Sequence, residues 1–449
     1  MKIPVTPPDL DQIIKANLDV LPKIFQMNIG PTDNKGRYLH WDKLRHLSPP
    51  ETIGIEELWA GIKIQRSLLS KNLPFLNKSG DGFKFCIIDS MQKDLHWLDL
   101  NAAGTISADK PMINTNMQGT YLISSLFEEA INSSQLEGAV TTRNVAKEML
   151  RQRRGPKDKS EQMILNNYHA MQFIRDFKTE AITPSFILEL HRILTEKTLK
   201  NPDKAGVLRL EEDDIEVVDT MTNTVLHVPP KASDLEKRLD ILCDFANKIL
   251  DVKGVFIHPV VRAIALHFML AYDHPFVDGN GRTARALFYW SMVNQGYWLA
   301  EFISISRILK QAPVQYGKAF LYTETDGNDV TYFIIHQLEV IKKAISDLHL
   351  YLEKKTKGIT QAQDMLQDAK NLGKKLNFRQ LALLRHALKH PGFTYKINEH
   401  KNSHGISYET ARKDLLFMSD NTKLLVKFKA GKSFVFMSPP NLEERIKKQ

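Results

Sequence analysis

The stretch that decides the fold is His274-Pro275-Phe276-Val277-Asp278-Gly279-Asn280-Gly281-Arg282-Thr283-Ala284-Arg285. It lies between two apolar segments, 259–273 and 283–295, whose periodicity predicts helices. Gly279 and Gly281 lack a Cβ, so backbone N–H groups around Asn280 can turn toward one point. The free N–H groups and the dipole at the start of the second helix add positive potential there. The stretch therefore predicts an anion site, above all for phosphate.

The charged side chains of the same stretch suit chemistry on a polyphosphate. Arg282 and Arg285 are three residues apart, so on a helix they lie on one face and can grip the same anion. Asp278 can hold a magnesium ion against that anion. His274 can take up a proton near neutral pH. A glycine loop with incidental charges would explain neither the two arginines nor the histidine.

This stretch resembles the signature of the Fic family (filamentation induced by cAMP), HxFx(D/E)GNGRxxR. Every specified position is matched, by His274, Phe276, Asp278, Gly279, Asn280, Gly281, Arg282 and Arg285. The resemblance implies a mainly α protein in which a Fic helical core carries a β-hairpin flap. It also implies transfer of AMP from ATP to a Ser, Thr or Tyr hydroxyl of a target protein, with Mg²⁺ as the metal.

The resemblance also assigns roles. His274 would deprotonate the acceptor hydroxyl, Asp278 would hold Mg²⁺ between the α- and β-phosphates, and the glycine loop would cradle the α-phosphate. Arg282 and Arg285 would bind the β- and γ-phosphates, pyrophosphate being the leaving group. The predicted nucleotide-binding residues are Asp278, Gly279, Asn280, Gly281, Arg282, Thr283, Arg285, Thr224, Val225, Leu226, His227 and Tyr316. For Tyr316, packing is an equally good interpretation.

Upstream of the stretch, the sequence contains a candidate inhibitory segment. Gly138 is a good residue to follow a helix, which puts Glu137 at the unfavourable negative end of the helix dipole. An arginine from elsewhere would compensate that carboxylate. Self-inhibited Fic proteins are similar here, with (S/T)xxxE(G/N), which Ser133, Glu137 and Gly138 match. The resemblance implies that Glu137 pairs with Arg285 and prevents productive ATP binding; an ordinary exposed glutamate is the alternative.

A change of period predicts a β-hairpin in otherwise helical sequence. Residues 215–218 and 225–228 are β-branched and partly alternating, and Pro229-Pro230 ends the second run. An exposed strand can pair with an extended peptide. In Fic proteins a hairpin here, the flap, holds the segment being modified, so the target protein would dock on 215–228. A hairpin with no role in binding is the alternative.

Composition describes a globular protein of several domains. The chain has 449 residues, 43% hydrophobic and 25% charged, with a formal charge of +9. Two distant cysteines, Cys86 and Cys243, predict neither a disulfide framework nor a zinc site. No apolar run is long enough to span a bilayer, and the N-terminus lacks an apolar signal core. We therefore expect a cytoplasmic protein with no membrane contact.

We predict an N-terminal α+β region (1–115), a Fic core with the inhibitory helix (116–357), a linker (358–375) and a winged-helix-like α+β domain (376–449). In the last domain, helices are followed by two alternating strands around Ala430-Gly431. Residues 407–437 could bind DNA or dock a protein. Transfer of UMP, phosphocholine or phosphate, removal of AMP, a DNA-binding regulator with a Fic sensor core, self-modification and homodimerisation are further possibilities.

Overall fold

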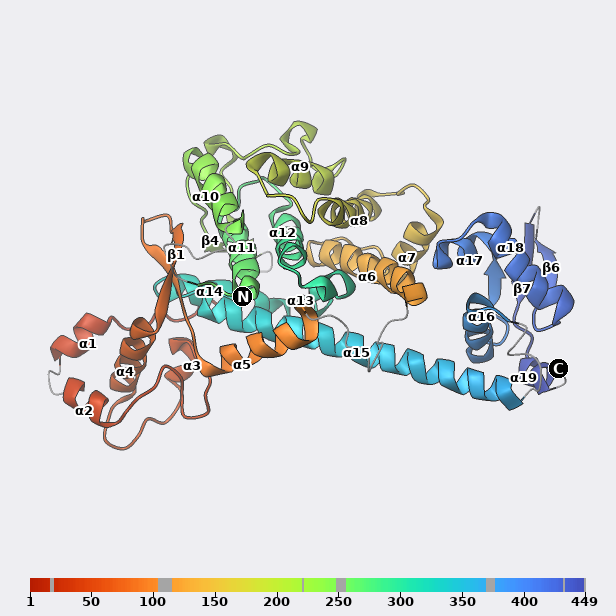
Figure 1. Cartoon of the computed structure of the whole chain (residues 1–449). Helices are drawn as coiled ribbons and strands as arrows, with labels where there is room; N and C mark the ends of the chain where they lie inside the picture. Colours follow the sequence, from red (N-terminus) through yellow and green to blue (C-terminus); the bar gives the residue numbers. More distant parts are fainter. Residues whose placement is uncertain are drawn as a thin grey trace. The chain divides into compact units, whose positions relative to one another are not determined.

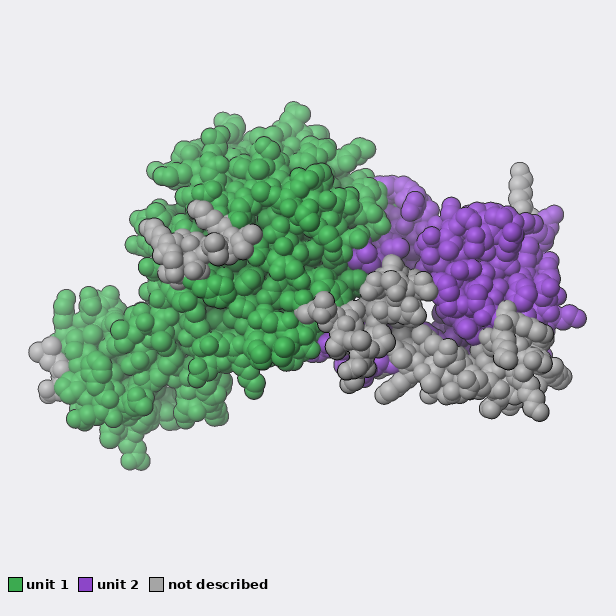
Figure 2. Space-filling model, viewed as in Figure 1, with its two compact units in different colours: residues 1–105, 128–140, 157–345 green, residues 106–127, 141–156, 346–449 purple. Residues whose placement is uncertain are grey.

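The computed structural model describes residues 1–16, 20–103, 115–219, 222–247, 256–368, 376–430 and 433–447. The chain divides into two compact units (Figure 2). The first comprises Met1–Thr105, Glu128–Val140 and Lys157–Ile345, and the second comprises Ile106–Phe127, Thr141–Pro156 and Ser346–Gln449. The division into four segments expected from the sequence stays a prediction.

Two buried helices lie at the centre of the first unit, α11 (Pro259–Asp273) and α12 (Asn280–Asn294) (Figure 1). Both are buried on nearly every face, as expected for helices that are apolar all round. His258 caps α11, and Pro259 occupies its first position. The surrounding helices are α8 (Lys159–Asp176), α9 (Pro184–Thr195), α10 (Leu235–Asn247), α13 (Ile305–Leu309) and α14 (Pro313–Thr325).

The N-terminal part of the first unit has a small core of its own, in which Trp41 and Trp59 lie 5.8 Å apart. Residues Gly82–Cys86 form a strand that pairs antiparallel with the preceding strand. Lys84 exchanges two backbone hydrogen bonds with the residues just before α15. The elements are α1 (Leu10–Ala16), α2 (Val20–Gln26), α3 (Trp41–Leu44), α4 (Ile55–Leu68), β1 (Ser70–Leu76), β2 (Gly82–Cys86) and α5 (Asp89–Leu98).

Two long helices contribute residues to both units, α6 (Thr115–Leu136) and α15 (Thr331–Asp368). Helix α15 continues to Asp368, past residue 358, where we expected a linker to begin. Residues 359–368 are rich in Gln, Ala, Leu and Met, which are strong helix formers. They outweigh Gly358, whose cost inside a helix is only about 1 kcal/mol relative to alanine.

The second unit contains α7 (Arg143–Gln152) and a C-terminal set of helices and strands. That set comprises α16 (Phe378–Lys389), β5 (Thr394–Lys396), α17 (Ile397–His404), α18 (Tyr408–Leu416), β6 (Val426–Ala430), β7 (Ser433–Met437) and α19 (Leu442–Lys447). The strands form one antiparallel sheet in the order β5-β7-β6. The three helices and the β6–β7 hairpin follow the predicted order, whereas the strand β5 was not predicted; the arrangement is consistent with a winged helix. Across the described ranges, no helix is both long and apolar enough to cross a membrane.

Candidate functional site

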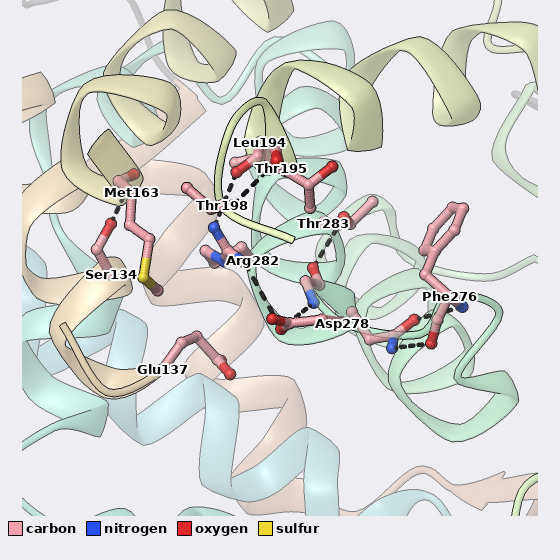
Figure 3. Close-up of polar contacts among 12 residues, drawn as sticks. Ser134, Glu137, Met163, Leu194, Thr195, Thr198, Phe276, Asp278, Arg282 and Thr283 are labelled. Carbon is pink, nitrogen blue, oxygen red and sulfur yellow. Dashed lines mark hydrogen bonds and ion pairs between the residues drawn. The ribbon is translucent and has the colours of Figure 1, made fainter. Parts of the chain in front are cut away.

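The loop between α11 and α12 is fastened by its own asparagine. Asn280 Oδ1 accepts the Phe276 N–H at 2.9 Å, and Asn280 Nδ2 donates to the Phe276 carbonyl at 2.7 Å (Figure 3). This side chain therefore braces the loop, so only its backbone N–H can face a ligand. Gly279 caps α12 with φ +88°, where a Cβ would also lie 2.8 Å from Thr195 Cγ2. Only glycine fits there without strain.

A histidine outside the motif supports this loop from α9. His191 is fully buried and stacks on Phe276 with ring centroids 3.7 Å apart. Its Nδ1 accepts the Gly206 N–H at 2.9 Å, so its Nε2 carries the proton and donates to the Asp278 carbonyl at 2.8 Å. Burial lowers the pKa of His191 to about 4, which keeps the ring neutral. The sequence did not identify this positioning residue.

His274 is a neutral imidazole that donates a hydrogen bond from one of its ring nitrogens. Its Nδ1 donates to the Ala271 carbonyl at 3.2 Å, which leaves the lone pair on Nε2. Burial lowers the pKa of His274 to about 4 despite that hydrogen bond. Arg209, also missed from the sequence, donates from Nε to the His274 carbonyl at 2.9 Å and from Nη2 to the Pro230 carbonyl at 2.5 Å. It fixes the backbone that carries the imidazole.

Arg282 is a buried cation with unused hydrogen-bond donors. Its side chain is 1% exposed, and Nη1 donates to the Leu194 carbonyl at 2.8 Å (Figure 3). Nη2 lies 3.7 Å from Asp278 Oδ1, beyond hydrogen-bonding distance. Within the described residues, its Nε and Nη2 meet no hydrogen-bond acceptor. Buried donors are almost always satisfied, so this guanidinium points to an anionic ligand.

Arg285 is clamped by the upstream segment. It is 1% exposed, and its Nη2 donates to Glu137 Oε1 at 2.8 Å. Its Nε donates to Ser133 Oγ at 3.0 Å, and its Nη2 also reaches the Ser133 carbonyl at 3.2 Å. Helix α6 ends at Leu136, and Gly138 has φ +93°, the left-handed conformation expected after a helix end. Burial would raise the pKa of Glu137, but Arg285 lowers it below its usual value.

The Glu137 carboxylate also lies over the start of α12. A Cβ added at Gly281 would collide with Glu137 Oε1 and would lie 3.0 Å from Arg285 Nη1. The first N–H groups of α12 have no partner inside the helix and favour an anion. Glu137 therefore brings a carboxylate to the place where the motif would bind phosphate (Figure 3).

The predicted hairpin is present, with β3 (Val217–Asp219) antiparallel to β4 (Thr224–His227). Residues 220 and 221 at its tip lie outside the described residues. Val225 is 40% exposed, while Thr224 and Leu226 are half-buried. His227 differs from the expectation that it lines the site. It is buried, and its ring nitrogens lie 2.7 Å from Glu324 Oε2 and 2.7 Å from the Tyr272 carbonyl, so it anchors the strand.

Tyr316 packs between helices. Its hydroxyl lies 2.8 Å from Nε2 of the buried His267 on α11, and burial raises its pKa to about 12. This is the packing interpretation that we considered for Tyr316.

Asp278 is the only motif carboxylate, and its side chain is 53% exposed. Its Oδ1 accepts the Gly279 N–H at 2.5 Å. No cluster of three or more His, Cys, Asp or Glu residues able to hold a metal exists in the part of the chain that the structure describes.

Comparisons with known proteins point to one family. Residues 181–292 match the sequence model of the Fic/DOC family. A protein adenylyltransferase Fic from Nematostella vectensis is 29% identical over 177 residues, 38% of each chain. Another, from Aedes aegypti, is 34% identical over 121 residues, 27% of this chain and 21% of that protein. The chain thus spans less than two fifths of the length of these relatives.

A solved Fic family protein from Desulfovibrio desulfuricans G20 aligns with 79% of this chain and 97% of its own, with 15% identity and a TM-score of 0.48.

Proposed function

We propose that this chain, whose residues 181–292 match the Fic/DOC family model, transfers AMP from ATP to a side-chain hydroxyl of a target protein, and that Glu137 restrains the transfer. The unsatisfied buried guanidinium of Arg282, in the first turn of α12, is the observation that carries the proposal. A polyphosphate would supply the acceptors that this arginine and the first turn of α12 lack.

His274 is the proposed general base. Its Nε2 takes the proton of the acceptor hydroxyl as the oxygen attacks the α-phosphorus, the bond from that phosphorus to the bridging oxygen breaks, and pyrophosphate leaves. The low pKa of His274 means that the imidazole is already deprotonated at neutral pH. Its proton affinity is then expected to rise when the anionic nucleotide lies beside it.

The phosphates are assigned by charge and position. The N–H groups at the start of α12 face the α-phosphate, where negative charge builds up during transfer. Arg282 and Arg285 hold the β- and γ-phosphates and neutralise the leaving pyrophosphate. Positioning and charge neutralisation account for the rate, because little covalent work is asked of the protein.

Magnesium fits Asp278. This exposed carboxylate uses only Oδ1 in its contacts with Gly279 and Arg282. One carboxylate together with substrate phosphates is the usual protein site for Mg²⁺. When bound, the ion neutralises phosphate charge and orients the leaving group.

The restraint follows from competition for the same charges. Glu137 neutralises Arg285 and lies over Gly281, so a γ-phosphate could reach neither group until the carboxylate moves. The acceptor side chain would lie along β4, where Val225 offers exposed apolar surface. A cytoplasmic location and homodimer formation stay predictions.

The test measures incorporation of labelled AMP into the protein itself and into lysate proteins. We expect incorporation by the Glu137→Gly variant and none when His274→Ala is added to it. The matched control is His169→Ala, which replaces an exposed histidine on α8 and should leave incorporation unchanged. Full labelling without the His274 imidazole would refute the assigned base. Parallel assays with UTP and with a pre-modified target separate AMP transfer from transfer of UMP and from removal of AMP.

A further inference from the structure

The positive charge of this chain is concentrated in two segments of the second unit. Residues 376–449 contain 14 Lys and Arg against six Asp and Glu, a net +8. Residues 141–156 contain five basic residues against one acidic residue, a net +4. Subtracting this +12 from the formal total of +9 leaves −3 for all other residues. Such asymmetry is the electrostatic footprint of a polyanion-binding surface.

The C-terminal segment has the geometry of a helix-turn-helix. Helices α17 and α18 are joined by Gly405, Ile406 and Ser407, with Gly405 at φ +63° and Ser407 Oγ accepting the Thr410 N–H at 3.1 Å. A short turn containing glycine is typical of this motif, whose second helix enters the DNA major groove. Helix α18 is the second helix here.

Helix α18 presents a basic and aromatic outer face. Ala411 and Leu415 are buried in the core, whereas Tyr408, Arg412 and Lys413 are exposed. These last three are the side chains that reach phosphates and base edges in such motifs.

The acidic residues of α18 do not cancel this charge. Asp414 is buried and satisfied by Arg379 at 2.6 Å, so it supports the fold. Glu409 is exposed and lies 3.2 Å from Arg412, and that exposed pair is weak enough to open when a phosphate arrives.

The second basic segment lies against the first helix of the motif. Asn402 of α17 donates from Nδ2 to the Arg151 carbonyl at the end of α7, at 2.5 Å. Arg151 and Arg153 are both exposed. In helix-turn-helix proteins the first helix crosses the sugar–phosphate backbone. Residues 141–156 carry a net charge of +4, and a phosphate backbone that crosses α17 would neutralise that charge.

We propose that duplex DNA is a ligand of this protein, with α18 in the major groove and two arginines on the flanking phosphates, Arg151 of α7 and Arg153 just after that helix. The shape of the motif favours DNA over duplex RNA, because the major groove of A-form RNA is too deep and narrow to admit a helix. These two arginines distinguish this surface from one formed by the winged helix alone.

The experiment uses the full chain and a fluorescein-labelled DNA duplex of about 30 base pairs, with anisotropy measured from low to physiological salt. We expect the logarithm of the association constant to fall steeply as the logarithm of the salt concentration rises. The pair Arg412→Ala with Lys413→Ala, and separately Arg151→Ala with Arg153→Ala, should each reduce that slope by about two. The matched control, Lys231→Ala with Lys237→Ala, removes two exposed lysines of the first unit and should change nothing.

Two results would overturn the proposal: no binding at low salt, or equal affinity for a duplex RNA of the same length. An unchanged slope in the variant that carries Arg151→Ala and Arg153→Ala would show that these two arginines do not contact the DNA. Circular dichroism of each variant establishes that the fold is retained.

Discussion

Replacing Glu137 by glutamine tests the restraint with the smallest change of shape. The substitution keeps a carbonyl oxygen for Arg285 but removes the charge from a contact of 2.8 Å. A hydrogen bond to a charged group contributes about 1.5–3 kcal/mol, and a neutral one about 0.5–1.5 kcal/mol. Matched ends of these two ranges differ by about 1–1.5 kcal/mol, and because the Glu137 side chain is 31% exposed we take the lower value, about 1 kcal/mol. At about 1.4 kcal/mol per factor of ten, this corresponds to about a fivefold gain in the released population.

The assay is the initial rate of AMP incorporation at saturating ATP and Mg²⁺. We expect the Glu137→Gln rate to exceed the wild-type rate by that factor. Glu148→Gln, which alters an exposed glutamate on α7, should leave the rate unchanged. Equal rates for Glu137→Gln and wild type, in proteins of equal melting temperature, would refute the inhibitory role of the charge.

The pH dependence of the restraint follows from the same contact. The pKa of Glu137 is lowered by Arg285, so the pair is intact above the ordinary glutamate value and is lost only as pH falls through the lowered pKa. The ratio of the Glu137→Gln rate to the wild-type rate should therefore be constant between about pH 6 and about pH 8. A ratio that collapses within this window would mean that a different group controls release.

Three further substitutions probe the site. Gly279→Ala should abolish transfer and destabilise the fold by about 1–3 kcal/mol, measured by urea denaturation, because φ is +88° and Thr195 blocks a Cβ; wild-type stability would contradict the strain argument. Asp278→Asn should raise the Mg²⁺ concentration needed for half-maximal rate about tenfold or more, read from a metal titration; an unchanged requirement would place the ion elsewhere. Ser133→Ala removes one hydrogen bond from Arg285 and should raise the transfer rate about two- to tenfold; a slower rate would show that Ser133 supports catalysis instead.

The motif loop could be predicted from the sequence because its functional residues follow one another within a short stretch. The glycines, the imidazole and both arginines fall within residues 274–285, so helix periodicity alone places them together. The mainly α fold and the hairpin near Val225 are confirmed for the same reason, since each depends on a local pattern. The proximity of Glu137 to Arg285, far apart in sequence, was expected only through the family resemblance.

Local sequence patterns could not predict polar contacts between residues that are far apart in the chain. Arg209 reaches the His274 carbonyl across 65 residues, and nothing in its neighbourhood marks it as buried. His191 did carry a signal, because Ile187, Leu190 and Leu194 put it on the apolar face of its helix. His227 was assigned to the ligand side, but Glu324 and Tyr272 hold its ring inside the protein.

AMP transfer by this loop and its restraint by Glu137 can be measured together by intact-mass spectrometry of the Glu137→Gly protein incubated with ATP and Mg²⁺. We expect this protein to gain one or more AMP units. The gain should be absent when His274→Ala is added and much smaller in the wild-type protein. An unchanged mass in the Glu137→Gly protein, together with no AMP on any lysate protein, would contradict the proposed transfer.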